Sequence, residues 1–192
     1  KPPGLPLDQA AYLSETAYVD EQIGRLVDTF QRLGLLQDSL LLVTSDHGEE
    51  FINPYGRPIG HGRTLFHSTL HVPFLCVGPS RIPAGKRVAN RVESVDILPT
   101  LLELAGLSRD PTPSGKSLVS LFASSGNAYD KTEAIAEGIR RGEERKCLYQ
   151  DPYKLVYFRD SGRTMLYDLH TDPGELNDLA PDHPDLVKRL KQ

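Results

Sequence analysis

The sequence predicts a mixed α/β fold with a small antiparallel sheet near its C-terminal end. The first part of the chain shows the order helix, strand, loop, strand, helix, which is typical of α/β proteins. From about residue 133 the pattern changes to short strands separated by turns, followed by a short helix. A chain of 192 residues holds one domain or slightly more. We place the boundary between two regions, 1–125 and 126–192.

The first helix is predicted between Asp8 and Leu33, where apolar side chains recur every three or four residues and so share one face. Asp8 suits the N-cap. Gly34 suits the position after the last turn, where a left-handed backbone favours glycine. An apolar run, Leu40 to Thr44, follows. Because it shows no polar alternation, we expect a strand covered on both faces, as in the centre of a parallel sheet.

A loop, a second strand and a second helix are predicted next. Residues 49–63 are rich in Gly, Pro and Asn, which is typical of a loop. Residues 72–78 form the second apolar strand. Ser94 or Asp96 would start the helix that follows, and Gly106 would end it. We therefore interpret Asp96 as a structural residue.

Four short antiparallel strands are predicted in the C-terminal region. Two turn-forming pairs, Asp151–Pro152 and Ser161–Gly162, separate the last three strands. The final segment, HPDLVKRLKQ, is typical of a short helix. The strands are expected at residues 133–139, 145–150, 153–158 and 164–169.

Composition and charge exclude several classes of function. A net charge of −4 offers no electrostatic case for binding nucleic acid. No apolar run approaches the roughly 20 residues that a membrane-spanning helix needs. Cys76 and Cys147 are interpreted as buried thiols, with a disulfide as the alternative. The opening KPPGLPLDQ lacks the features of a signal peptide and is read as a connection inside a larger protein. The sequence therefore does not distinguish between a periplasmic, a secreted and a cytoplasmic location.

Charged residues follow the first strand abruptly in the stretch LLLVTSDHGEEF. Asp46 and His47 come just after the end of that strand, where α/β proteins bind ligands, and Gly48 lets the chain turn so that both could reach one ligand. A carboxylate beside an imidazole is half of a divalent-metal site. The other interpretation, which two residues alone favour, makes Asp46 a turn residue and His47 a solvent-facing neighbour. Glu49 and Glu50 are predicted to be solvated, with a supporting role behind the ligands of the site as the alternative.

His61 lies in the following loop between two glycines, which would let the backbone come close to a ligand. With Arg63 two residues on, His61 could protonate a leaving group while the guanidinium holds an anion. A surface loop that happens to contain a histidine explains the pattern equally well. His67 and His71 lie close enough in sequence to line the same site.

Four segments carry a family resemblance. They are YVDEQIGRLVDTFQRLGLLQDS, TSDHGEEF with GHGRTLFHSTLHVPFL, VESVDILPTLLELAGL, and LYDLHTDPGELNDLA. In this order they resemble the C-terminal half of a sulfatase, a family of the alkaline phosphatase superfamily, and they span nearly the whole chain. The resemblance implies that residues 1–125 are the C-terminal part of an alkaline phosphatase-like αβα sandwich. Residues 126–192 would then be a small antiparallel sheet with a terminal helix.

The resemblance also implies roles for the candidate residues. Asp46 and His47 match the pair that binds the divalent cation of the site. That cation is calcium in most sulfatases, with manganese or zinc in related hydrolases that carry Asp-His. His61 falls where the family places a Lys or His that contacts the sulfate and the leaving oxygen, and Arg63 would supply the cation if His61 did not. The implied substrate is a sulfated small molecule or glycan.

Two parts of a sulfatase site find no match in this sequence. One is the Cys/Ser-x-Pro-x-Arg motif whose first residue becomes formylglycine; the spacing in Cys76–Arg81 is wrong for it. The other is the N-terminal Asp pair that completes the metal shell. We expect both in an N-terminal half outside this chain. The chain alone should then be inactive, with an exposed sheet edge or apolar face that favours a homo-oligomer of the fragment.

The function expected of the full-length protein is hydrolysis of sulfuric esters with a metal-bound, formylglycine-type nucleophile. One alternative keeps the superfamily and changes the substrate: a phosphodiester or phosphonate hydrolase, or a phosphoethanolamine-type transferase. A second alternative is a non-catalytic binding or assembly module in which the Asp46–His47 pair is only a turn.

Overall fold

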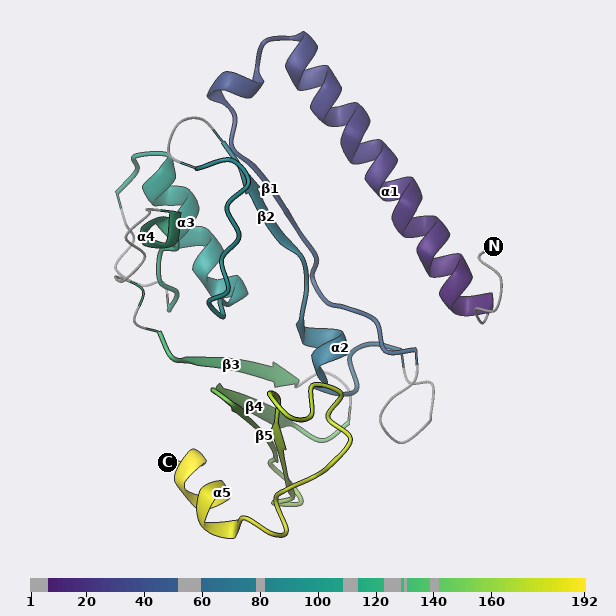
Figure 1. Ribbon diagram of the computed structural model, residues 1–192, viewed down its shortest axis with the longest axis vertical. Coiled ribbons are helices and arrows are strands. Elements are labelled where there is room, and N and C mark those ends of the chain that lie inside the picture. Colours follow the sequence, from purple (N-terminus) through teal and green to yellow (C-terminus); the bar gives the residue numbers. More distant parts are fainter. Residues whose placement is uncertain are drawn as a thin grey trace. The chain divides into compact units, whose positions relative to one another are not determined.

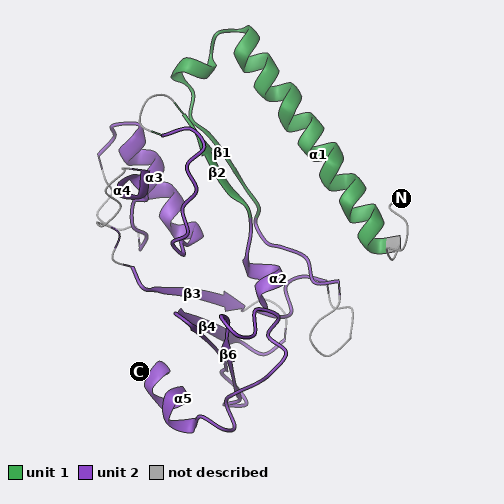
Figure 2. Cartoon of the chain, viewed as in Figure 1, with its two compact units in different colours: residues 1–45, 73–82 green, residues 46–72, 83–192 purple. Residues whose placement is uncertain are grey.

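The computed structural model describes residues 7–51, 60–78, 82–108, 114–122, 129, 131–138 and 142–192. The chain divides into two compact units (Figure 2). Unit 1 comprises residues 1–45 and 73–82, and unit 2 comprises residues 46–72 and 83–192. The boundary predicted between residues 125 and 126 lies outside the described residues, so that division of the chain stays a prediction.

Unit 1 begins with a long helix, α1 (Leu7–Arg32), which confirms the helix predicted from apolar spacing. Gly34 has a φ of 69° and ends it as predicted. The Gly34 and Leu35 amides donate to the carbonyls of Gln31 and Phe30, a Schellman motif that satisfies two terminal carbonyl groups. A 3₁₀ turn, η1 (Leu36–Asp38), follows. Neither α1 nor any other helix among the described residues is long and apolar enough to cross a membrane.

The two strands of unit 1, β1 (Leu41–Thr44) and β2 (Phe74–Val77), pair in antiparallel register (Figure 1). The expectation of a central parallel strand covered on both faces is therefore wrong for this pair. Leu75 and Val77 on β2 are 55% and 60% exposed. An apolar run signals a tendency to be buried, but it contains no information about the direction of its partner strand, which the rest of the chain determines.

Unit 2 contains the remaining helices and the C-terminal sheet. The predicted helix after residue 93 is confirmed as a 3₁₀ turn that continues into α3, and Gly106, with a φ of 70°, ends it with a second Schellman motif. The predicted terminal helix is confirmed with Pro184 in its first turn. The bounds are α2 (His67–Leu70), η2 (Ser94–Asp96), α3 (Ile97–Leu104), α4 (Val119–Phe122) and α5 (Pro184–Leu190).

The C-terminal sheet is the antiparallel meander that the sequence predicts (Figure 1). Its strands, in spatial and sequence order, are β3 (Glu133–Gly138), β4 (Arg145–Gln150), β5 (Tyr153–Phe158) and β6 (Thr164–Asp168). The two faces of β5 contribute to two different hydrophobic cores, because neighbouring side chains on a strand point in opposite directions. Val156 packs in one core with Phe66 and Tyr167, and Leu155 packs in the other with Leu190 of α5.

Both cysteines are free thiols, as predicted. Cys147 on β4 is fully buried in the core that contains Val156, and burial raises the pKa of its thiol to about 12. Cys76 on β2 is half-buried. Neither thiol is therefore a structural cross-link within this chain.

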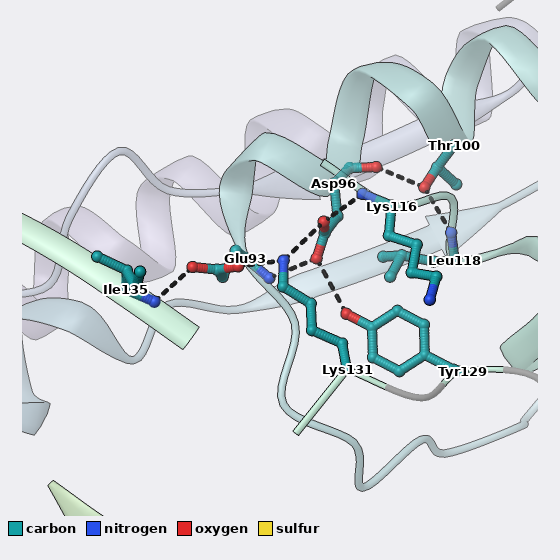
Figure 3. Close-up of polar contacts among 8 residues, drawn as sticks. All are labelled: Glu93, Asp96, Thr100, Lys116, Leu118, Tyr129, Lys131 and Ile135. Atoms are coloured by element: carbon teal, nitrogen blue, oxygen red, sulfur yellow. Dashed lines mark hydrogen bonds and ion pairs between the residues drawn. The ribbon is translucent and has the colours of Figure 1, made fainter. Parts of the chain in front are cut away.

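Asp96 is the centre of a buried polar network at the start of α3 (Figure 3). Its Oδ2 accepts hydrogen bonds from the Glu93 amide at 2.9 Å and the Tyr129 hydroxyl at 3.1 Å. Its Oδ1 accepts from the Lys116 amide at 2.7 Å and from Lys131 Nζ at 3.2 Å. Burial acts to raise the pKa of this carboxyl, but the donated hydrogen bonds and the Lys131 charge outweigh it and hold the pKa below its usual value.

The same network ties together segments that are distant in sequence. Thr100 Oγ1 donates to the Asp96 carbonyl at 2.6 Å and accepts from the Leu118 amide at 2.9 Å. Glu93 pairs with Lys131 and accepts from the Ile135 amide of β3 at 2.5 Å. The sequence indicated Ser94 or Asp96 as the start of this helix. In the structure a capping box from Glu93 to Asp96 starts η2, and Asp96 is the N-cap residue of α3. The structural interpretation of Asp96 agrees with these contacts.

We expect Asp96→Asn to lower the free energy of unfolding by about 3 kcal/mol at neutral pH, because one partner of a buried hydrogen-bonded ion pair is removed. The folded-state pKa of Asp96 is depressed, so its stabilisation is full above the unfolded pKa and is lost as pH falls through the folded pKa. Urea titrations at pH 7 and below about pH 4 should therefore show the gap between wild type and variant narrowing in acid. Asp182→Asn, at an exposed position, serves as the control.

Candidate functional site

Asp46 and His47 form an exposed turn at the start of unit 2. The His47 amide donates to Asp46 Oδ1 at 3.0 Å, and His47 Nε2 lies 3.5 Å from Asp46 Oδ2. His47 Nδ1 lies 2.9 Å from the carbonyl oxygen of Gly48. Because a carbonyl only accepts, Nδ1 donates this bond, so that in the neutral ring Nε2 carries the lone pair. The carboxylate and the candidate ligating nitrogen lie close to each other.

The turn is held against α2 through Gly48. Its amide donates to the carbonyl of Thr69 at 2.8 Å. A Cβ at this position would lie 2.1 Å from the carbonyl oxygen of Ser68, closer than any real contact. Only glycine allows the backbone to approach α2 this closely, so position 48 determines where the Asp46–His47 turn lies within unit 2.

His61 returns to this turn from the other end of the loop. Its ring stacks on that of His47, with centroids 4.2 Å apart and planes inclined by 22°. Its Nδ1 lies 3.1 Å from Glu49 Oε2. The flanking Gly60 and Gly62 both have positive φ values, 72° and 77°, a backbone conformation that favours glycine. The structure thus brings together three of the four residues that the sequence put forward.

The fourth residue, Arg63, is exposed and lies two positions after His61 in the same loop. His67 and His71 stack on each other, with centroids 4.5 Å apart, across α2. Burial lowers the pKa of His67, and the nearby cationic groups of His71 and Lys154 lower it further. These two histidines form a separate pair, since the contacts of the described residues include none between their rings and the His47–His61 stack.

Glu49 and Glu50 were both expected in solvent, and for Glu50 this is wrong. Glu49 is half-buried and contacts His61. Glu50 is only 1% exposed; one carboxylate oxygen accepts from the Thr64 hydroxyl, and the other has no hydrogen-bond partner among the described residues. Burial raises the pKa of Glu50, and the Thr64 hydrogen bond opposes this. The buried Glu50 carboxylate is stabilised there by the Thr64 hydrogen bond and by the positive charge of Lys154, which lowers its pKa.

A buried ion pair that the sequence analysis missed lies beneath the loop. Lys154 on β5 is 0% exposed, and its Nζ donates to the carbonyl of Leu65 at 2.5 Å and to a carboxylate oxygen of Glu175. The other oxygen of Glu175 accepts from the His67 amide at 2.6 Å. One signal was available: Lys154 shares the inward face of β5 with Val156, and a lysine on an apolar face requires a buried acceptor.

The donor set fits half of a metal site. Asp46 offers a carboxylate, and His47 offers Nε2 while its Nδ1 is held by a backbone carbonyl, the usual outer-shell arrangement of a metal-binding histidine. Within the part of the chain that the structure describes, no group of three or more His, Cys, Asp or Glu side chains could hold a metal ion. Any metal at this site would need further ligands.

Comparisons with known proteins identify the family. The sulfatase family model matches residues 8–107, and the model for the C-terminal region of N-sulphoglucosamine sulphohydrolase matches residues 61–192. The chain belongs to the sulfatase family. Sulfatases generally use a metal ion and formylglycine, which agrees with the resemblance found in the sequence. The expected fold class, a C-terminal portion of the sulfatase fold, is also confirmed by structural neighbours.

Curated relatives and solved structures cover almost the whole chain. Mouse arylsulfatase K is 29% identical over 197 residues, with 96% of this chain and 34% of the relative covered. Choline-sulfatase of Rhizobium meliloti is 31% identical over 88% of this chain and 32% of its own. BT4656, solved with its substrate D-glucosamine-2-N,6-O-disulfate, matches with a TM-score of 0.84 at 25% identity, over 94% of this chain and 38% of its own. The chain therefore spans about a third of the length of its relatives.

We expect Gly48→Ala to displace the Asp46–His47 turn from α2, since the added methyl overlaps the Ser68 carbonyl group. The free energy of unfolding should fall by more than about 2 kcal/mol. Gly24→Ala is the matched control, because a Cβ there meets no atom within 4 Å and alanine favours the interior of α1 by about 0.5–1 kcal/mol. Thermal unfolding of both variants checks the prediction; equal stability of the two would contradict the close approach.

Proposed function

We propose that the complete protein is a sulfuric ester hydrolase and that this chain supplies part of its metal site and its leaving-group chemistry. The observation that carries the proposal is the stacking of His47 on His61. It brings a candidate metal ligand and a candidate proton donor, fourteen positions apart in sequence, into one place. Without this stacking contact, the presence of a histidine in a glycine-rich loop would be weak support for a catalytic role.

We infer that Asp46 and His47 hold a divalent cation and that the ion is calcium, as sulfatases lead one to expect. The carboxylate suits calcium, whereas the imidazole nitrogen is a ligand that manganese and zinc accept more readily. A bound dication would neutralise sulfate oxygens and increase the reactivity of a nearby nucleophile. The formylglycine nucleophile is expected in the part of the protein that precedes this chain.

His61 is proposed as the group that protonates the departing oxygen. Glu49 accepts a hydrogen bond from Nδ1–H of the ring, which orients the imidazole and leaves Nε2 for the substrate. Arg63, exposed two residues later, is proposed to hold the sulfate anion. In this proposal Glu49 acts through His61 and does not touch the substrate.

A sulfated small molecule or glycan is the proposed substrate. Two relatives support this class, because one is named a choline-sulfatase and another was solved with a disulfated glucosamine. The chain alone is proposed to be inactive, since the described residues supply only two metal ligands. Its exposed apolar side chains, such as Leu75 and Val77, are proposed to drive self-association when it is made alone.

We expect Asp46→Ala in the complete protein to abolish most bound metal and most sulfatase activity, because its carboxylate is the charged member of the proposed ligand pair Asp46 and His47. Metal analysis of the purified protein, with the ion identified, is the measurement. The control is Asp151→Ala, since Asp151 is also an exposed aspartate beside a histidine, 3.2 Å from His170. Unchanged metal content and activity in the Asp46 variant would favour a non-catalytic module instead.

His61→Ala should reduce kcat by about 100-fold or more on alkyl sulfates, whose leaving groups need a proton. The loss should be much smaller on 4-nitrophenyl sulfate, whose leaving phenolate is stable without one. Steady-state kinetics with a series of leaving groups measures this dependence. A loss of the same size for every leaving group would rule out His61 as the proton donor.

One related activity has specific support. The phosphonate monoester hydrolase of Agrobacterium radiobacter matches with a TM-score of 0.77 at 26% identity, over 90% of this chain and 37% of its own. An anion-binding site built from a dication, His61 and Arg63 would also suit a phosphonate ester. Comparing kcat/KM for matched sulfate and phosphonate esters on the complete protein separates the two substrates, and a higher value for the phosphonate would overturn the sulfatase proposal.

A further inference from the structure

We propose that Lys154 and Glu175 are positioning residues: their buried ion pair holds the segment that follows His61 and Arg63, and so sets the place of the proton donor. The proposal rests on the proposed function, because it assigns a role to residues that touch neither metal nor substrate. It gives the C-terminal sheet, through Lys154 on β5, a role in the proposed reaction. Neither the sequence analysis nor the candidate site had indicated such a role.

The ion pair grips one short segment at two points. Lys154 Nζ donates to the carbonyl of Leu65 at 2.5 Å, and Glu175 accepts from the amide of His67 at 2.6 Å. The two charged groups also contact each other, with 0% and 2% of their side chains exposed. A backbone carbonyl and a backbone amide two residues apart are therefore both held by one buried ion pair.

The base of the loop is held from its other side by Glu50. Its carbonyl accepts from the Gly60 amide at 3.0 Å, and its carboxylate accepts from the Thr64 hydroxyl. Glu50 thus contacts Gly60 before His61 and Thr64 after Arg63, and Lys154 contacts Leu65, the next residue. These contacts hold the residues on both sides of His61, whose ring stacks on that of His47.

The Lys154–Glu175 ion pair and the Glu50 carboxylate also interact electrostatically. Burial raises the pKa of Glu50 and the negative charge of Glu175 raises it further, whereas Lys154 lowers it. Of the groups that influence Glu50, Lys154 is the one that carries positive charge. Removing this ammonium would leave two buried carboxylates and the Leu65 carbonyl without their shared cation. The structure would relieve that imbalance by moving the segment that bears Thr64 and Leu65.

Lys131 offers a matched control in the same unit. Its ammonium pairs with Glu93 and Asp96, and its side chain is 22% exposed, whereas Lys154 pairs with Glu175. Among the described residues, the contacts of Lys131 lie at the start of α3. Lys131→Met and Lys154→Met therefore both remove a cation from a carboxylate partner, but only the second should disturb the position of His61.

The experiment compares Lys154→Met with Lys131→Met in the complete, metal-loaded protein. For Lys154→Met we expect kcat on an alkyl sulfate to fall by about 10-fold or more, and kcat on 4-nitrophenyl sulfate to fall far less. For Lys131→Met we expect lower thermal stability, whereas the dependence of kcat on the leaving group should stay that of the wild type. Glu175→Gln keeps the side-chain volume and one acceptor oxygen, so it should show the same dependence of kcat on the leaving group with a smaller loss. This variant tests the proposal if Lys154→Met does not fold.

A loss in Lys154→Met that is equal for all leaving groups would overturn the proposal, as would the same pattern in Lys131→Met. His61→Ala, measured alongside, separates this inference from the proposed function. If His61→Ala shows the leaving-group dependence and the Lys154 and Glu175 variants do not, only the positioning role fails. If His61→Ala shows none, the role of His61 as proton donor fails, and the positioning role fails with it.

Discussion

A buried pair of opposite charges, Lys154 and Glu175, joins the C-terminal sheet to the segment beneath the candidate site. Burying an ammonium and a carboxylate is costly unless each is fully satisfied. Here the ammonium also donates a hydrogen bond to the Leu65 carbonyl, and the carboxylate accepts one from the His67 amide. Such a pair contributes little net stability compared with apolar side chains of the same size. Its main effect is orientation, because both charges form hydrogen bonds with the backbone of residues 65–67 in this placement.

The elements that could be predicted from the sequence are those with local signals. Gly34 and Gly106 end their helices as expected, since a left-handed residue after the last turn is determined within a few residues. The meander could be predicted because turn residues separate its strands. The direction of β1 could not, because its antiparallel partner β2 lies about thirty residues away and the apolar run is the same in either direction.

In the candidate site, too, the residues could be predicted from local signals but their contacts could not. Asp46, His47 and His61 could be put forward from residue type and from their place in the chain, but their contact depends on Gly48 and on the loop conformation. The two glutamates after Gly48 look equivalent in sequence. One nevertheless orients His61 while the other is buried, because the partners that distinguish them are His61 and Thr64 on the far side of the loop, together with Lys154 on β5. Non-local partners of this kind leave no trace in the local pattern.

The loop that carries His61 belongs, by its contacts, to the C-terminal sheet. The family model for the C-terminal region begins its match at residue 61, and the compact unit that contains the sheet also contains residues 46–72. A sulfatase needs its metal ligands in a constant arrangement, whereas the depth of the proton donor must suit the leaving group. In the proposed function, Lys154 and Glu175 hold the segment that follows the candidate proton donor His61, whereas the backbone contact of Gly48 with α2 holds the Asp46–His47 turn. Substitution of Lys154 or Glu175 would then act first on residues 65–67 and, through them, on the neighbouring His61.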